Sequence, residues 1–200
     1  MVNGTLHVVG IGGTTRPTSS TQSCVRFVLD ALEERGVTTS AFGGPELSQL
    51  PLYAPERPER TDEARRLVAA LRQADGVVIG SPGYHGTVSG LVKNALDHTE
   101  DLSRDDRVYF TGLPVGCIAT GWGWQAAVST LQTLRTITHA LRGWPTPLGV
   151  GVNTSTPVFD DHGSCIDEGT CSKLSTVAEE VFAFMSGELN TVPTRVPARV

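Results

Sequence analysis

Residues 12–21 read GGTTRPTSST and join an apolar run at 6–11 (LHVVGI) to an amphipathic run at 22–35. This loop offers six hydroxyl side chains, the guanidinium of Arg16, and two glycines that let backbone N–H groups turn toward one point. The N-terminus of the following helix adds unpaired N–H groups and roughly half a positive charge. The stretch therefore predicts a strand, a phosphate-binding loop and a helix, in that order.

Simpler or more familiar interpretations explain this loop less well. A helix N-cap needs one Ser or Thr hydroxyl, and the loop supplies six. Gly10 and Gly12 begin a dinucleotide-binding fingerprint, but Thr15 occupies the position of its third glycine. The GK[ST] sequence of a P-loop is also missing. We therefore expect a different kind of phosphate loop.

Length and charge limit the class of protein. Two hundred residues suffice for one α/β domain, which we expect at 1–186, followed by a loosely ordered tail at 187–200. The 16 Lys and Arg against 21 Asp and Glu give a net charge of −5 and no electrostatic basis for binding nucleic acid or an anionic membrane. No apolar run approaches the roughly 20 residues of a membrane span, and the first ten residues lack the features of a signal peptide. We expect a cytoplasmic protein.

The four cysteines show no metal-binding spacing, so we expect no metal site. Cys165 and Cys171 are close enough in sequence to meet in a loop and the start of a helix. In a cytoplasmic protein the expected state of such a pair is two reduced thiols.

Apolar runs alternate with helical patterns along the chain, which is typical of repeated βαβ units around a parallel sheet. The expected strands are 6–11, 37–42, 76–80, 115–120 and 147–152, with 108–110 leading into the fourth strand or into a bulge ahead of it. The expected helices are 20–35, one capped by Thr61, 88–101, 125–142 and 170–184. Segment 43–60 is predicted to be a loop, and 81–87 neither helix nor regular strand. The fold class is α/β, a three-layer sandwich with a five-stranded parallel sheet.

Glycine-rich loops follow the first, third and fourth strands, and in a parallel sheet such loops emerge at one edge. With strand order 2-1-3-4-5, the phosphate loop lies beside 81–87, SPGYHGT. A ligand that meets both loops needs a phosphate at one end. At the other end it needs a flat group to meet Pro82, Tyr84, Trp122 and Trp124. FMN has that anatomy.

Specific motifs support this interpretation. Residues 13–21 match G-[ST]-x-R-x-x-S-x-[NT], and 81–97 match SPxYHGxxSGxxKNALD. A glycine-rich turn follows the fourth strand, and 159–168 match FDxxGxxxDE. From about 5 to 185 the chain resembles the NADPH-dependent FMN reductase family of flavodoxin-like proteins. It departs from the family's all-glycine turn at Trp122 and Trp124, which are either flavin contacts or subunit-interface residues.

The resemblance implies a set of site residues. Those of the phosphate loop would hold the FMN phosphate, and those of 82–86 would line the isoalloxazine ring, largely through backbone N–H groups. The expected cofactor-binding residues are Thr14, Arg16, Ser19, Ser20, Thr21, Pro82, Gly83, Tyr84, His85, Gly86, Gly121, Trp122 and Gly123. Hydride transfer to the flavin needs no side-chain catalyst. His85 could be a general acid, but we favour a role in shaping its loop.

The function implied is an NAD(P)H-dependent FMN reductase, with the choice between NADH and NADPH open. It could supply reduced FMN to a separate monooxygenase, or reduce a quinone, an azo dye or a metal oxyanion on bound FMN. A flavodoxin-type electron carrier without nicotinamide activity is an alternative, and a non-flavin nucleotide-binding protein is a third. The family resemblance also implies a homodimer or homotetramer.

Overall fold

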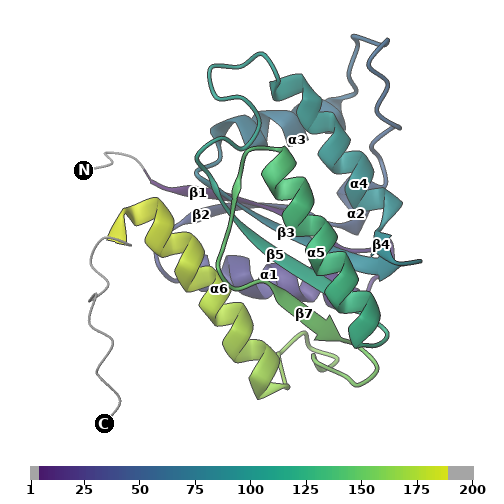
Figure 1. Ribbon diagram of the computed structural model, residues 1–200, viewed down its shortest axis with the longest axis vertical. Helices are drawn as coiled ribbons and strands as arrows, with labels where there is room; N and C mark the ends of the chain where they lie inside the picture. The colour runs from purple at the N-terminus through teal and green to yellow at the C-terminus, as the bar shows by residue number, and fades with distance from the viewer. Residues whose placement is uncertain (1–4, 189–200) are drawn as a thin grey trace.

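The computed structural model describes residues 5–188, which form a parallel sheet with helices packed on both faces (Figure 1). The strands are β1 (His7–Gly12), β2 (Thr38–Phe42), β3 (Gly76–Tyr84), β4 (Thr87–Val88), β5 (Pro114–Gly121), β6 (Trp144–Pro145) and β7 (Val150–Asn153). The helices are α1 (Ser20–Glu33), α2 (Gly44–Leu47), α3 (Asp62–Gln73), α4 (Gly90–Asp97), the 3-10 helix η1 (His98–Leu102), α5 (Trp124–Ala140) and α6 (Glu168–Ser186). The predicted three-layer α/β sandwich is confirmed.

Two apolar clusters bury the two faces of the sheet. On one face, α1 and α6 contribute residues such as Leu29 and Val177 to a cluster with Val8 and Val78 of the sheet. On the other face, side chains of α2 to α5 pack on the strand residues that point the opposite way. The strands carry apolar residues on both sides because both sides are covered.

The strand order is β2-β1-β3-β5-β6. β7 also pairs directly with β5, nearer the carboxyl end of β5 than β6 does. All these pairs are parallel, and β4 pairs antiparallel with β3. The predicted order 2-1-3-4-5 is therefore confirmed. The strand expected at 147–152 begins later, as β7, and the short β6 ahead of it was not expected. The chain leaves β5 between Pro145 and Val150, where Pro147 has no N–H to give to the sheet.

The prediction that 81–87 contains no regular strand was wrong. β3 continues to Tyr84 because its residues stay paired with β5 as far as Pro82 and Thr120. His85 and Gly86, with φ of 52° and 90°, then make a two-residue turn into β4. Positive φ at both central residues is typical of a type I′ hairpin turn, which matches the twist of the strands.

Three further segments differ from expectation. Segment 43–60 contains α2, whose Leu47 is buried in the core. The helix expected at 88–101 begins at Gly90 after the cap Ser89 and passes into η1. Residues 108–110 form a turn ahead of β5, in which Phe110 N donates to Leu141 O.

The last helix, α6, begins earlier than expected because Asp167 caps it. It ends at Gly187, whose left-handed conformation (φ 77°) is common after a helix. The rest of the predicted tail, 189–200, lies outside the described residues, and the domain limits 1–186 stay a prediction.

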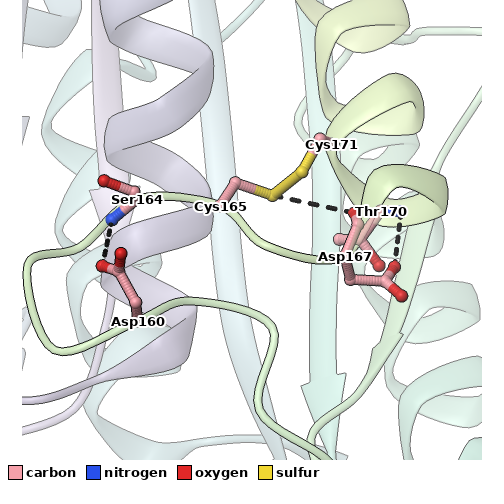
Figure 2. Close-up of a disulfide and its surroundings, with 6 residues drawn as sticks. All are labelled: Asp160, Ser164, Cys165, Asp167, Thr170 and Cys171. Atoms are coloured by element: carbon pink, nitrogen blue, oxygen red, sulfur yellow. Dashed lines mark hydrogen bonds between the residues drawn. A yellow bond between two sulfur atoms is a disulfide. The ribbon is translucent and has the colours of Figure 1, made fainter.

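Cys165 and Cys171 form a disulfide (Figure 2), so the prediction of two reduced thiols was wrong. The Asp160 carboxylate accepts hydrogen bonds from His162 N and Ser164 N, and this turn brings Cys165 back beside Phe159 in an isolated β-bridge. Cys171 lies in the first turn of α6, with its Cα 6.0 Å from that of Cys165. The fold of the loop, rather than the spacing of the cysteines, brings the two sulfurs together.

Candidate functional site

A cavity of about 290 Å³ opens at the carboxyl edge of the sheet, where β1, β3 and β5 end side by side. It is lined by Thr14, Arg16, Thr18, Ser19, Ser20, Thr21, Pro82, Gly83, Tyr84, Thr120, Gly121, Trp122 and Thr154. Ten of the thirteen residues expected at the site are among these. His85, Gly86 and Gly123 do not line this cavity.

Sequence reasoning left Thr18, Thr120 and Thr154 out of the site. Thr18 lies in the phosphate loop, and the other two lie at or just after the carboxyl ends of β5 and β7. Ligands bind at the carboxyl edge of a parallel sheet, and this rule could have predicted Thr120 and Thr154 from their positions at the ends of strands.

Ser19 shapes the phosphate loop. It is the N-cap of α1, and its Oγ accepts hydrogen bonds from Gln22 N (3.2 Å) and Thr14 N (3.1 Å). The side chain of Thr14 accepts in turn from Arg16 N. The hydroxyl of Ser19 is therefore committed to the loop itself, so the helix-cap interpretation applies to this residue.

Thr21 is also held by the protein. Its hydroxyl lies 2.6 Å from that of Thr120, and both side chains are buried. This hydrogen bond ties the first turn of α1 to the end of β5. Of the other loop hydroxyls on the cavity wall, those of Thr18 and Ser20 make no hydrogen bond with the described residues, and that of Thr14 accepts only from Arg16 N.

Arg16 is the one charged side chain on the cavity wall. It is exposed and makes no ion pair within residues 5–188. The wall contains no carboxylate that would neutralise Arg16 or repel an anion. A free guanidinium beside a helix N-terminus favours binding of a phosphate or carboxylate group.

Helix α2 supports this loop from behind. A Cβ added to Gly44 would overlap the carbonyl oxygen of Thr14, so the two backbones are in direct contact. Gln22 Oε1 of α1 accepts a long hydrogen bond (3.4 Å) from Gly44 N. The segment predicted to be a plain loop therefore fixes the back of the phosphate loop.

The β3–β4 hairpin forms the opposite wall. Ser81 Oγ accepts from Ser89 N (3.0 Å) and donates to Pro82 O (2.9 Å), which holds the base of the hairpin. Tyr84 stands at its end, half exposed beside the cavity. His85 is in the turn, exposed, and makes no hydrogen bond or ion pair with the described residues.

Within residues 5–188, His, Cys, Asp and Glu form no cluster of three or more that could hold a metal ion. The same residues contain no helix with both the length and the apolar content of a membrane span.

Comparison with known proteins agrees with the predicted fold and with the family resemblance. A family model described as NADPH-dependent FMN reductase matches residues 6–156. The FMN-dependent NADPH-azoreductase of Staphylococcus saprophyticus is 39% identical over 104 residues, which are 52% of this chain and 48% of that protein. That of Staphylococcus aureus is 29% identical over 159 residues, which are 76% of this chain and 79% of that protein. The chain thus spans about half the length of the first relative and most of the second.

Solved structures show the same fold at low sequence identity. The flavoenzyme NAD(P)H:(acceptor) oxidoreductase FerB from Paracoccus denitrificans superposes with a TM-score of 0.74 and 19% identity, covering 91% of this chain and 98% of that one. A flavodoxin from Streptococcus pneumonia TIGR4 gives a TM-score of 0.58 and 15% identity, covering 89% and 98%. The expected flavodoxin-like fold is confirmed.

Proposed function

Because the chain belongs to the NADPH-dependent FMN reductase family, we propose that it is an NAD(P)H-dependent oxidoreductase that binds FMN in the cavity at the sheet edge. One observation carries the proposal: the wall pairs a free cation, Arg16, with the N-terminus of α1 and several hydroxyls, and it contains no acidic group. That donor set fits the phosphate of a mononucleotide.

The proposed roles follow the two ends of such a ligand. Arg16, Thr14, Ser20 and the backbone at the start of α1 would bind the phosphate, with Ser19 and Thr21 holding the loop in shape. Pro82, Gly83 and Tyr84 would line the flavin ring on the other side. The turn residues His85 and Gly86 would shape the hairpin without touching the phosphate end.

Bound FMN would supply a ring that can take a hydride from NADPH and pass two electrons to an acceptor. Reduction of a quinone to a hydroquinone would consume NADPH and one proton. The protein's part is to position the reactants, since the wall contains no Asp, Glu, His or Lys that could exchange a proton at neutral pH. Solvent water at the open side of the cavity would supply the proton. No side-chain nucleophile or acid is required.

The names of the relatives favour reduction of an acceptor on bound FMN. Both are called FMN-dependent NADPH-azoreductases, so we propose an organic acceptor such as an azo dye or quinone. Supply of free reduced FMN to a monooxygenase is the second candidate. A homodimer or homotetramer and a cytoplasmic location also stay predictions.

The test is NADPH and NADH oxidation by the purified protein, with and without added FMN and with a quinone acceptor. We expect an oxidised-flavin absorption spectrum that survives gel filtration, together with ping-pong kinetics. FMN that behaves as a saturable, dissociating substrate would instead favour the supply of reduced flavin. An FMN-loaded protein that does not oxidise either nucleotide would indicate a flavodoxin-type carrier, and failure to bind FMN would contradict the proposal.

A further inference from the structure

The turn after β5 can carry a large side chain at one position. A Cβ added to Gly121 would lie 2.8 Å from both Ala126 Cβ and Ala127 N, which is too close. Gly123 has a φ of 122°, which disfavours any residue with a side chain. Trp122 lies between these two glycines. It is therefore the position of the turn that can carry a large side chain, and its indole has no neighbouring side chain along the chain on either side.

This turn is held in place. Thr154, directly after β7, donates from both its N (2.9 Å) and its Oγ1 (3.2 Å) to Gly121 O. Gly123 N donates to the same carbonyl group (2.9 Å), and Gly123 caps α5. The backbone that carries Trp122 is therefore fixed, so little backbone entropy is lost when a ligand contacts the indole.

Trp122 faces solvent at the rim of the proposed FMN cavity. Trp122 is 82% exposed, although it lines the cavity. Tyr84, 49% exposed, stands on the same rim, and each of the two lies two residues beyond the paired residues Thr120 and Pro82 of neighbouring strands. Because the indole stands at the rim, a ligand inside the cavity meets it from the cavity side. The part of the ring that faces solvent is open to a second molecule.

We propose that Trp122 is a stacking platform for a planar aromatic electron acceptor at the mouth of the flavin cavity. The inference rests on the proposed function and names the acceptor subsite. A flat aromatic molecule fits because indole and phenol rings bind such molecules by offset stacking and exclusion of water. With a quinone the reaction balances: the quinone takes two electrons and two protons to become a hydroquinone, and NADPH and one proton supply them as NADP⁺ forms.

The test compares Trp122→Ala with Trp122→Phe, which keeps an aromatic ring. Trp144→Ala is the matched control, because Trp144 is 59% exposed but lies on β6 beside the amino end of β5, opposite the cavity edge. The first measurement titrates the FMN-loaded protein with the azo dye methyl red in the absence of NADPH. We expect Trp122→Ala to raise the dye's Kd about tenfold, Trp122→Phe to restore most of the affinity, and Trp144→Ala to leave it unchanged.

The second measurement is the ratio of kcat/KM for a planar quinone to kcat/KM for ferricyanide, which is not aromatic. We expect this ratio to fall about tenfold in Trp122→Ala, mainly through the KM for quinone. Unchanged dye affinity and an unchanged ratio would overturn the platform. So would a rise in the Kd of FMN, or a shift in oligomer mass, with no change in the ratio, because Trp122 would then belong to the cofactor site or to a subunit contact.

The two proposals fail in different ways. A wild-type protein that oxidises no NADPH with either acceptor contradicts the proposed function, and the dye titration still tests the platform. Activity with both acceptors, combined with a dye Kd that does not respond to Trp122→Ala, contradicts the platform alone.

Discussion

The hydroxyl oxygens of Thr21 and Thr120 lie 2.6 Å apart, in the protein interior, where α1 begins and β5 ends. The two residues are 99 positions apart in sequence. Thr21 is the last residue of the phosphate loop, and Thr120 precedes the turn that carries Trp122. This hydrogen bond therefore couples two walls of the cavity.

Thr120→Val keeps the shape of the side chain but leaves the Thr21 hydroxyl buried without its partner. We expect the free energy of unfolding to fall by about 1–3 kcal/mol, the cost of an unsatisfied buried polar group. Urea unfolding measures the change, with Thr136→Val on the exposed side of α5 as a control expected to stay within about 0.5 kcal/mol. The double variant Thr21→Val/Thr120→Val should cost less than the two single changes together. Strict additivity would show that the pair makes no interaction.

Arg16→Ala should weaken FMN binding by about 2 kcal/mol, because it removes the one cation on the cavity wall. Fluorescence titration measures the affinity. Riboflavin, which lacks the phosphate, should bind the variant and the wild type equally well. Arg104→Ala is the control, since Arg104 is exposed in the turn after η1. An equal loss of affinity for FMN and riboflavin would show that Arg16 does not bind the phosphate.

The parts of the site that the sequence predicts are those set by local chemistry. The density of hydroxyls around Arg16 and the alternation of strands and helices depend on neighbouring residues, and the carboxyl-edge rule then brings the loops together. The β3–β4 hairpin was missed because Pro82 and Gly83 resemble strand breakers. Its pairing with β5, a contact with a distant segment, keeps β3 extended to Tyr84.

Other features depend on contacts that no local pattern contains. Helix α2 is four residues long, and it forms where Leu47 can enter the core and Gly44 can touch Thr14 O. The hydroxyl of Thr21 is chemically suited to a phosphate, yet Thr120 is the partner it meets. Whether a hydroxyl binds ligand or protein is decided by such long-range packing.

His85→Asn tests whether a side-chain acid takes part in hydride transfer. Asn tolerates the left-handed conformation that His85 adopts (φ 52°) but cannot act as a general acid. Because His85 is exposed and does not line the cavity, we expect flavin reduction by NADPH in a stopped-flow experiment to change less than about threefold. His139→Asn, an exposed change near the end of α5, is the control. A hundredfold loss confined to His85→Asn would mean that this imidazole is catalytic.

The four cysteines, all within the described residues, should divide into two unreactive thiols and one disulfide. Burial raises the pKa of the Cys24 thiol to about 12 and also raises that of Cys117, so neither forms the reactive thiolate at pH 8. With Ellman's reagent we expect almost no reaction of the native protein purified without reductant. Unfolding should release about two thiols per chain, and reduction before unfolding about four. Cys165→Ser is the control, since it frees the half-buried Cys171, which should then react in the native state. Four thiols in the unfolded, unreduced protein would mean that Cys165 and Cys171 are not joined.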